Sequence, residues 1–400
     1  MSILSGKKIL LGITGGIAAY KTPLIVRLLK SKKAEVRVVM TPAAKDFVTP
    51  LTLSTLSENS VLSSFTDSQN DNPVWNNHVE LGKWADLFII APATSRTISA
   101  MVNAKCNNLL IATYLSCTSK VYVAPSMDLD MYNHPSNQSN LEKLKSIGNV
   151  VLPVGEGFLA SGLHGKGRML EPEDIIKRVE QDILAKLPLN GKKVLITAGP
   201  TYEPIDPVRF ISNHSTGKMG FALAEHAVKL GAEVTLIAGP TAISTTSDMQ
   251  IINVVTSEEM FIQVKKIFNK TDIAIAAAAV ADFKPKKSHK FKLKKEFNLD
   301  TIKLLPTHDI LAWMGENKNQ QFLVGFALET NDEIKNAIRK LKSKNLDAIV
   351  MNSLKNSGAG FSVDTNKVSY ISRKEEIINF ELKLKNQVAE DIFTQILKNE

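Results

Sequence analysis

Two glycine-containing turns have the residue types that bind anions. The run ISNHSTGKMG, from Ile211 to Gly220, follows the strand-like segment KKVLITAGPT and predicts a polar, flexible turn at the start of a helix. Backbone N–H groups at such a turn can bind phosphate or carboxylate. A second strand-turn-helix unit, GITGGIAAYK at Gly12 to Lys21, lies near the start of the chain. The sequence therefore predicts two phosphate-handling domains and two linked reactions.

The segments that must position these turns alternate between apolar strands and helices. In the first half, helical stretches at 17–30, 42–56 and 95–115 separate the strand-like runs KKILLGIT, EVRVVMT, WADLFIIAP and KVYVAP. This alternation predicts a parallel sheet covered by helices on both faces. Ligands of such a sheet bind at the carboxyl ends of its strands.

The segment AKLPLNG, from Ala185 to Gly191, has the composition of a domain boundary. We place the boundary between residues 187 and 188, which gives domains 1–187 and 188–400. Beyond it the pattern restarts, with helices predicted at 221–230, 258–268 and 332–344 and with KVSYIS and a terminal helix closing the unit. The predicted fold class is therefore α/β, with two doubly wound, Rossmann-like domains.

Composition favours an ordinary globular protein. The chain has 400 residues, 44% of them hydrophobic and 22% charged, and it contains no apolar run near the roughly 20 residues that cross a bilayer. We therefore expect a cytoplasmic protein that does not bind membranes. Cys106 and Cys117, in the segment predicted as helix, are expected to be small core residues rather than disulfide or metal ligands. The net charge of +9 is compatible with nucleic acid or with anionic small substrates.

The first glycine turn favours a mononucleotide over a dinucleotide. Gly15 and Gly16 lack the full dinucleotide fingerprint, and the second strand ends in Met40 and Thr41 rather than in an acidic residue that would bind a ribose. FMN fits better, with Thr14, Gly15, Gly16 and Thr41 near its phosphate and ribitol. The alternative is a tight turn without a ligand.

Further motifs in the first half resemble those of the flavin-dependent cysteine decarboxylases. They are HVELGKWAD, APATSRT, PSMDLDMY and GFLASGLHGKGRM, and they extend over roughly the first 170 residues. The resemblance implies that FMN accepts electrons from a substrate thiol so that CO2 can leave, and that His78 deprotonates and orients the substrate. The residues implied to bind FMN are Thr14, Gly15, Gly16, Ile17, Thr41, Thr94, Ser95, Arg96, Thr97 and Ser126, and those implied to bind the substrate are Met127, Arg168 and Met169.

Two departures from that pattern concern candidate catalytic residues. Asp128 stands where the family has asparagine, and Tyr132 stands at the tryptophan position of the same motif. We hypothesise that Asp128 is protonated on binding or destabilises the substrate carboxylate. Ser161 stands where relatives have a proton-donating cysteine, so water or another group must deliver that proton. The segment 162–169, which includes Arg168, is predicted to be a lid or else a mobile surface loop.

The second half resembles the phosphopantothenate-cysteine ligase domain of bacterial coenzyme A biosynthesis. The matching runs are ITAGPTYEPIDPVRFISNHSTGKMG, AAAVADF, KLKK, HDIL, VGFALET and KSKNLD. The resemblance implies that the carboxylate of 4′-phosphopantothenate attacks the α-phosphorus of CTP with Mg²⁺ present. Pyrophosphate then leaves, and the nitrogen of L-cysteine displaces CMP from the acyl-cytidylate. Such chemistry requires cations and oriented amides around the phosphates.

The resemblance also assigns roles to residues of the second half. Asn213 and Lys292 are candidate catalytic residues, and Arg209 is a candidate contact to the substrate phosphate. The nucleotide is implied to contact Asp282, Lys292, His308, Asp309, Ile310, Leu311, Phe326, Lys340 and Lys344. The lysine-rich run 284–296 is interpreted as a mobile loop that closes on CTP, although in isolation such a run could be a solvated or nucleic-acid-binding face.

Together these motifs predict a bifunctional enzyme with an N-terminal flavoprotein domain and a C-terminal ligase domain. The ligase product, 4′-phosphopantothenoylcysteine, would be decarboxylated to 4′-phosphopantetheine. The resemblance further suggests a homo-oligomer with no nucleic-acid partner. The alternatives are a flavin-dependent decarboxylase of peptidyl cysteine with a non-ligase C-terminal domain, and a basic nucleic-acid-binding protein.

Overall fold

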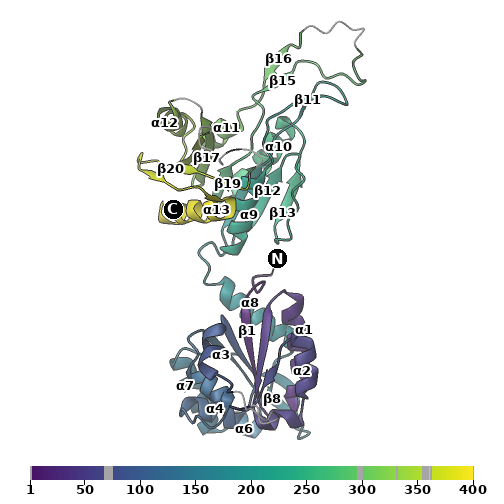
Figure 1. Ribbon diagram of the computed structural model, residues 1–400, viewed down its shortest axis with the longest axis vertical. Helices are drawn as coiled ribbons and strands as arrows, with labels where there is room; N and C mark the ends of the chain where they lie inside the picture. Colours follow the sequence, from purple (N-terminus) through teal and green to yellow (C-terminus); the bar gives the residue numbers. More distant parts are fainter. Residues whose placement is uncertain are drawn as a thin grey trace. The chain divides into compact units, whose positions relative to one another are not determined.

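The computed structural model describes residues 2–66, 75–294, 301–329, 332–353, 360 and 363–399. The chain divides into two compact units, Met1–Ala185 and Lys186–Glu400 (Figure 1). The predicted boundary at 187/188 falls close to this division. Residues 295–296 of the lysine-rich run and Thr330 of the VGFALET motif lie outside the described residues.

Unit 1 is built on a parallel sheet. The described strands of this sheet occur in the order β3-β2-β1-β4-β5-β6, and all neighbouring pairs are parallel. All seven residues of β4 are buried, as a strand covered on both faces requires. The order reverses direction between β1 and β4, so a crevice is expected at their carboxyl ends. The strands are β1 (Lys8–Ile13), β2 (Glu35–Met40), β3 (Val61–Leu62), β4 (Leu87–Ala93), β5 (Lys120–Pro125) and β6 (Val150–Val151).

Helices cover both faces of this sheet because alternate strand residues point to opposite sides. Ile9 and Leu11 pack with α1, α2 and α8, whereas Leu10 packs with α4, α5 and α7. A short hairpin, β7 (Gly155–Phe158) with β8 (His164–Arg168), completes the unit. The helices are η1 (Ile17–Lys21), α1 (Thr22–Ser31), η2 (Pro42–Asp46), α2 (Pro50–Ser57), α3 (His78–Trp84), α4 (Ser95–Val102), α5 (Leu109–Leu115), α6 (Leu129–Asn133), α7 (Pro135–Ser146) and α8 (Pro172–Leu184).

The prediction of one helix over residues 95–115 was wrong. The chain forms two helices there, α4 and α5. The first ends because Ala104 adopts a left-handed conformation, with φ 52°. The second begins where the Asn108 side chain accepts a hydrogen bond from the Ile111 N–H at 3.0 Å. Cys106 lies in the intervening loop and is exposed, so its predicted core position was also wrong. Cys117, just after α5, is half-buried.

Unit 2 repeats the same architecture with additional strands. Its described sheet has the order β13-β12-β9-β14-β17-β18-β20-β21, in which β13 through β18 are parallel and β20 and β21 are antiparallel. The predicted α/β class with two doubly wound domains is confirmed. The strands are β9 (Lys193–Ala198), β12 (Glu233–Ala238), β13 (Gln250–Asn253), β14 (Ile273–Ala276), β17 (Phe322–Glu329), β18 (Ala348–Ser353), β20 (Val368–Ser372) and β21 (Ile377–Asn379).

The helices of unit 2 also divide between the two faces. Helices α9 and α13 pack on one face with Val194 and Ile196, and α10, α11 and α12 pack on the other with Leu195. The helices are α9 (Lys218–Lys229), α10 (Ser257–Ile267), η3 (Phe268–Lys270), α11 (Ile310–Glu316), α12 (Glu333–Ser343) and α13 (Lys385–Asn399).

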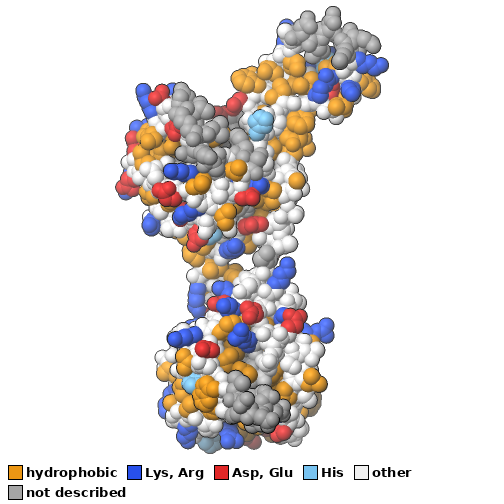
Figure 2. Space-filling view, in the orientation of Figure 1, with side chains coloured by type: hydrophobic (Ala, Val, Ile, Leu, Met, Phe, Trp, Pro, Cys, Tyr) orange, Lys and Arg blue, Asp and Glu red, His pale blue; other side chains and the backbone are white. Residues whose placement is uncertain are grey.

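Two hairpins of unit 2 pack together and form what we call the arm. They are β10 (Glu203–Pro204) with β11 (Phe210–Ile211), and β15 (Phe283–Pro285) with β16 (Leu304–Pro306). Tyr202 and Phe210 stack at its base, with ring centroids 3.9 Å apart. Figure 2 shows apolar and basic side chains gathered over this region, which includes the lysine-rich run as far as Lys294.

The packing of α9 on α13 contains a histidine whose titration should affect stability. The His226 ring lies 5.7 Å from the Phe393 ring. Burial lowers the pKa of His226 below its ordinary 6.5, and Lys229 adds to this while Glu390 opposes it. Since the folded pKa is depressed, the stabilising contribution is present above the unfolded pKa and is lost as the pH falls through the folded value.

We therefore expect unit 2 to lose stability below about pH 6.5, and His226→Phe to weaken that pH dependence. Hydrogen exchange of the α13 amides in the full chain, corrected for intrinsic rates at each pH, measures the effect. An identical pH dependence in the wild type and the variant would contradict the assignment.

Candidate active sites

Unit 1 has a cavity of about 530 Å³ at the carboxyl ends of its strands. Its walls come from the segments that follow β1, β2, β4 and β5 and from helix α4. The lining residues are Gly15, Thr41, Pro42, Ala43, Thr94, Ser95, Arg96, Thr97, Ala100, Asn107, Asn108, Ser126, Met127 and Met131.

Threonines join the two strand ends where the sheet order reverses. Thr14 directly follows β1, and its Oγ1 donates to the Pro92 carbonyl at 2.7 Å. The Thr94 N–H donates to the same Oγ1 at 3.2 Å. The turns after β1 and β4 are thereby held together, and Thr94 precedes α4 beside them without a side-chain cap.

Two further features suit a polar, phosphate-bearing ligand. A Cβ on Gly15 would lie 2.7 Å from the Ala43 Cβ, so a larger residue at position 15 would force the turn after β1 away from the turn after β2. The Thr41 Oγ1 is buried and has no hydrogen-bond partner among the described residues, and a buried hydroxyl without a partner is costly. Together with the N-terminus of α4 and Arg96, these groups could hold the phosphate and ribitol of FMN.

The structure brings most of the predicted flavin-binding residues to this cavity. Gly15, Thr41, Thr94 to Thr97 and Ser126 line it, as does Met127 from the predicted substrate contacts. Thr14 is buried and Gly16 has Thr94 as its neighbour, whereas the Ile17 side chain is 57% exposed. The sequence interpretation missed Asn107 and Asn108, which no motif marked, and Met131, which lies within the PSMDLDMY motif but was assigned no contact.

His78 does not line the cavity. It begins α3, and its ring contacts Phe65 and Trp75 edge-on, at centroid distances of 6.1 and 6.3 Å. Its Nδ1 is buried without a hydrogen-bond partner in the described part of the chain. Aromatic packing therefore holds the imidazole ring in place, and its Nδ1 makes no hydrogen bond to the described residues.

The predicted lid is the β7–β8 hairpin. The Met127 N–H donates to the Gly167 carbonyl at 3.0 Å, which links the hairpin to the residues after β5. Ser161 lies in the exposed turn, and Arg168 donates to Glu171 at 3.3 Å rather than lining the cavity. Met169 is buried in the core.

Asp128 has a structural partner of its own. Its Oδ1 accepts from the Leu129 N–H at 2.7 Å and so caps the short helix α6. Tyr132, three residues into that helix, packs against the α4, α5 and α7 side of the sheet. The carboxylate in place of the family's amide therefore has a local role in starting α6.

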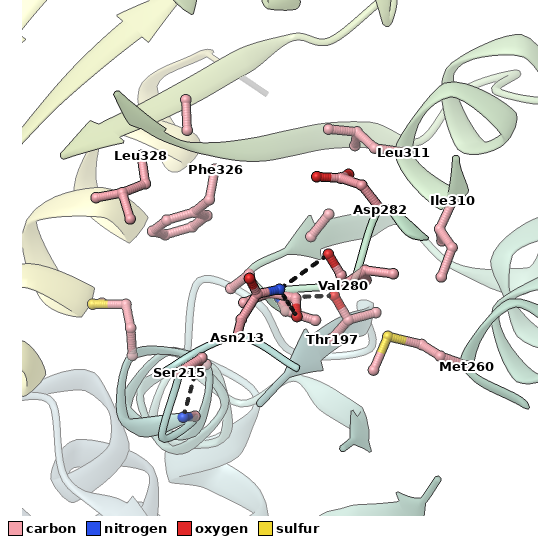
Figure 3. Close-up of a pocket in the computed structure, with 18 of the residues that line it drawn as sticks. Thr197, Asn213, Ser215, Met260, Val280, Asp282, Ile310, Leu311, Phe326 and Leu328 are labelled. Carbon is pink, nitrogen blue, oxygen red and sulfur yellow. Dashed lines mark hydrogen bonds between the residues drawn. The ribbon is translucent and has the colours of Figure 1, made fainter. Parts of the chain in front are cut away.

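Unit 2 has a larger cavity, of about 680 Å³, at the same edge of its sheet (Figure 3). It is lined from the segments after β9, β14, β17 and β18, from α11 and α12, and from the start of α13. The lining residues are Thr197, Asn213, Ser215, Thr216, Gly217, Lys218, Met219, Gly220, Met260, Ala276, Ala277, Ala278, Ala279, Val280, Asp282, Pro306, Thr307, His308, Asp309, Ile310, Leu311, Phe326, Ala327, Leu328, Lys340, Lys344, Asn352, Gly360, Asn366 and Lys385.

Asn213 lies near the middle of this group (Figure 3). Its Nδ2 donates to the Ala279 carbonyl at 2.9 Å and to the Val280 carbonyl at 3.3 Å. It therefore ties the segment after β9 to the segment after β14, where the strand order reverses. A side chain at this point is well placed to meet the reacting groups of a bound ligand.

The start of α9 comes close to the sheet. A Cβ on Gly220 would lie 2.4 Å from the Ala198 Cβ, and Gly217, at φ 82°, precedes the helix without a side-chain cap. The N–H groups of this first turn therefore border the cavity without a capping side chain, which is the arrangement that binds anions.

One wall of the cavity, formed by α11 and α12, carries several of the predicted nucleotide contacts. The Asp309 side chain caps α11 by accepting from the Ala312 N–H at 2.8 Å and pairs with Lys344, and the Lys340 Nζ donates to the Phe326 carbonyl at 2.9 Å. Burial acts to raise the pKa of Asp309, but hydrogen bonds from Lys344 and Ala312 outweigh it and lower that pKa. Asp309 is thus an anion held in place by a lysine.

The structure brings together eight of the nine predicted nucleotide contacts. Those that line the cavity are Asp282, His308, Asp309, Ile310, Leu311, Phe326, Lys340 and Lys344. The ring of His308 stacks on the ring of Phe261, with centroids 4.6 Å apart. Lys292 is exposed on the arm and does not line the cavity. The residues that the sequence interpretation missed include Met260, Asn352, Asn366 and Lys385.

Arg209 also lies on the arm, where it is bound to Asp206. Its Nε and Nη2 donate to the Asp206 Oδ2 at 3.0 and 2.5 Å. The same carboxylate accepts from the Leu293 N–H at 3.1 Å, and Arg209 donates to the Leu293 carbonyl at 2.8 Å. The pair therefore holds both peptide groups of Leu293, next to Lys292.

We expect Asp206→Asn to reduce the turnover of the predicted ligase reaction by about tenfold, because it removes the charge that holds Arg209 and the backbone beside Lys292. Arg209 lowers the pKa of Asp206 well below its ordinary 3.8, so the carboxylate is ionised throughout any neutral assay. Ligase turnover and proteolytic cleavage of the arm measure the effect. Unchanged turnover with an intact arm would contradict it.

The described residues contain neither a metal-binding cluster of acidic, histidine or cysteine side chains nor a helix that could cross a membrane. No group of three or more His, Cys, Asp or Glu side chains is arranged to hold a metal ion within the ranges described. None of the helices that the structure describes is long and apolar enough to span a bilayer.

Both halves of the chain match known family models. The model described as "Flavoprotein" matches residues 2–184, and the model "DNA/pantothenate metabolism flavoprotein C-terminal domain" matches residues 189–399. The two models thus correspond to the two units.

Similar proteins match over nearly the whole chain. A protein of an unknown prokaryotic organism named "Cysteine/Cysteine sulfinic acid decarboxylase" is 51% identical, over 88% of this chain and 99% of its own length. The "Coenzyme A biosynthesis bifunctional protein CoaBC" of Bacillus subtilis (strain 168) is 44% identical over 92% of this chain and 91% of its own length. The protein of the same name from Haemophilus influenzae is 43% identical over 99% and 98%.

These matches confirm the resemblance on which the residue assignments rest. Two family models account for the two units, and relatives that are 43% and 44% identical align over most of the length. The chain therefore belongs to the family of the coenzyme A biosynthesis bifunctional protein CoaBC.

Proposed function

We propose that this chain makes 4′-phosphopantetheine in two steps. Unit 2 condenses 4′-phosphopantothenate with L-cysteine at the expense of CTP, and unit 1 decarboxylates the product with FMN. The observation that carries the proposal is the unit 2 cavity, where Asn213 and eight predicted nucleotide contacts meet at the carboxyl edge of the sheet.

In unit 2 the residues act by positioning and by electrostatics. A carboxylate is a poor acyl donor, so its oxygen attacks the α-phosphorus of CTP and the bond to pyrophosphate breaks. Cysteine nitrogen then forms the amide, and CMP leaves. Lysines and the N-terminus of α9 stabilise the charge on the phosphate oxygens. Since the described residues contain no carboxylate cluster, Mg²⁺ would be bound mainly by triphosphate oxygens and water.

In unit 1 the cradle of Gly15, Thr41 and the α4 N-terminus would hold FMN. When bound, the flavin supplies the acceptor for the two electrons that leave the substrate thiol. His78 removes a proton and orients the substrate, Asp128 faces the substrate carboxylate, and Arg168 and the hairpin exclude water. Ser161 stands in place of the family's proton-donating cysteine, so water or another group delivers the final proton. The role of His78 and the position of Asp128 follow the family resemblance.

We also propose that the protein is a homo-oligomer in the cytoplasm. His78 does not line the cavity of its own chain. A role for His78 in decarboxylation therefore requires that it reach the cavity of a second copy. Exposed apolar side chains in the segments that follow β1 and β2 support this proposal, since large apolar surfaces favour association. They are Ile17, Tyr20, Phe47 and Leu51.

A second candidate is decarboxylation of free cysteine or cysteine sulfinic acid. It is favoured by the name of the 51% identical relative. That activity makes no use of a nucleotide cavity in unit 2, which is why we rank it second.

One assay separates the candidates. Purified protein is incubated with 4′-phosphopantothenate, cysteine, CTP and Mg²⁺, and in parallel with cysteine or cysteine sulfinic acid alone, and the products are identified by mass. The proposal expects 4′-phosphopantetheine, CMP, pyrophosphate and CO2 only in the first mixture. Release of CO2 from the free amino acid without CTP, and no amide product, would favour the second candidate.

A further inference from the structure

A buried amide joins two walls of the unit 1 cavity without lining the cavity itself. Asn137, in the first turn of α7, is only 8% exposed. Its Oδ1 accepts a hydrogen bond from the Ser95 Oγ at 2.7 Å, and its Nδ2 donates to the Met131 carbonyl at 2.6 Å. Ser95 begins α4, Met131 belongs to α6, and both residues line the cavity. Asn137 therefore ties α4 to α6 from outside the cavity.

The chemistry of these groups fixes the direction of each hydrogen bond. A carbonyl oxygen can only accept, so the NH2 end of the Asn137 amide must face Met131. The other end of the amide is itself a carbonyl oxygen, so Ser95 must donate its one hydroxyl proton to it. Because this proton is used, the Ser95 hydroxyl presents only lone pairs to a ligand in the cavity.

Several other polar groups of the cavity can donate instead. The Thr41 Oγ1 is buried and has no hydrogen-bond partner among the described residues, so its proton is available to a ligand. Arg96 and the N–H groups at the start of α4, which has no side-chain cap, are donors as well. These donors suit an anionic phosphate, whereas the lone pairs of Ser95 suit a ligand hydroxyl or N–H.

We propose that Asn137 is a positioning residue of the flavin site, which holds the Ser95 hydroxyl as an acceptor and fixes α6 beside it. Ser95 then accepts a hydrogen bond from a hydroxyl or N–H in the riboflavin part of FMN. The phosphate is bound by the donors at Thr41 and at the start of α4. This inference rests on the flavin function proposed for unit 1.

Flavin titration of the full chain, after removal of any bound flavin, tests the assignment with FMN and riboflavin as probes and flavin fluorescence as the readout. Ser95→Ala is expected to weaken binding of both flavins about three- to tenfold, the effect of one lost hydrogen bond. The two losses should be equal because riboflavin lacks only the phosphate. Asn137→Leu should weaken both flavins at least as much, because it releases the Ser95 proton and removes the bond to Met131.

The matched control is Asn149→Leu. The Asn149 Nδ2 donates to the Tyr114 hydroxyl and to the Leu144 carbonyl, both at 3.0 Å, and neither partner lines the cavity. This variant loses hydrogen bonds of the same kind and should bind both flavins like the wild type. Since Asn137 acts in part through Ser95, the double variant Ser95→Ala/Asn137→Leu should lose less affinity than the product of the two single losses.

Asn137→Asp gives a second test at the same position. A protonated aspartic acid can donate to the Met131 carbonyl and accept from Ser95, as the amide does, whereas a carboxylate has no proton to donate. Since a buried carboxyl takes up a proton more readily than an exposed one, riboflavin should bind this variant more tightly at about pH 5 than at about pH 8, relative to the wild type at each pH.

Three results would overturn the assignment: a loss for FMN but not for riboflavin in Ser95→Ala, wild-type flavin binding by Asn137→Leu, or an equal loss in Asn149→Leu. If thermal unfolding shows that Asn137→Leu does not fold, Ser95→Ala and the pH response of Asn137→Asp decide.

Decarboxylation is measured separately, so that the positioning role and the proposed function can fail independently. Flavin binding that depends on Ser95 and Asn137, without decarboxylation, refutes only the proposed reaction. Decarboxylation with unchanged flavin binding in both variants refutes only the positioning role. A wild-type chain that binds no FMN overturns both.

Discussion

Replacing Asn213 with aspartate is expected to lower amide formation roughly 10²–10³-fold, the loss typical when one preorganised donor is removed from a reacting centre. The Nδ2 of Asn213 donates to the Ala279 and Val280 carbonyls. A carboxylate would face these oxygens without a proton to donate, and it would add negative charge where phosphate charge develops. CTP-dependent release of CMP measures the loss.

The Asn213 experiment has two internal controls. Decarboxylation of supplied 4′-phosphopantothenoylcysteine should be unchanged, because that step is assigned to unit 1. Asn317→Asp removes a similar bond, from Nδ2 to the Trp313 carbonyl at 2.8 Å, but outside the cavity, and should leave both activities nearly intact. If Asn213→Asp retained the wild-type rate of the ligase reaction, Asn213 would not be a catalytic residue.

Replacing His78 with asparagine is expected to lower decarboxylation about 10²–10⁴-fold, the range for loss of a general acid or base. The imidazole is fixed by Phe65 and Trp75, and its buried Nδ1 has no hydrogen-bond partner among the described residues, so one nitrogen is available for proton transfer. Because His78 does not line the cavity, flavin absorbance per chain should be retained. CO2 release from 4′-phosphopantothenoylcysteine measures the rate.

The matched control for His78 is His134→Asn. His134 is an exposed histidine whose Nδ1 caps α7, a role that asparagine also performs, so its replacement should leave decarboxylation unchanged. Loss of flavin together with activity in His78→Asn would show a binding rather than a proton-transfer role. Full activity in His78→Asn would exclude His78 from the chemistry.

Much of the architecture could be predicted because its signals are local. The alternation of buried runs such as LFIIAPA with amphipathic helices is sufficient to predict parallel strands. Once the strands are parallel, residues that follow different strands must meet at one edge. For this reason Asn213, Asp282 and Phe326, distant in sequence, could be expected in one cavity, and the structure brings them there.

Local signals were misleading where a turn interrupts a helical pattern. Residues 95–115 are apolar enough for one long helix, but the left-handed Ala104 and the cap at Asn108 divide it and expose Cys106. One cap hydrogen bond and one left-handed backbone conformation therefore divide this segment into two helices. Neither is visible in hydrophobic periodicity.

The sequence by itself therefore determined the two doubly wound units and the strand-end residues of both candidate sites, since strand direction dictates where strand ends gather. Only the tertiary structure decided that the Asp206–Arg209 pair holds the peptide groups of Leu293, that His78 lies outside its own chain's cavity, and that Lys385 is a buried cation beside Lys218. These facts depend on packing between segments far apart in the chain. Burial and charge pairing between such segments follow from the folded arrangement and leave no mark in the local pattern of residues.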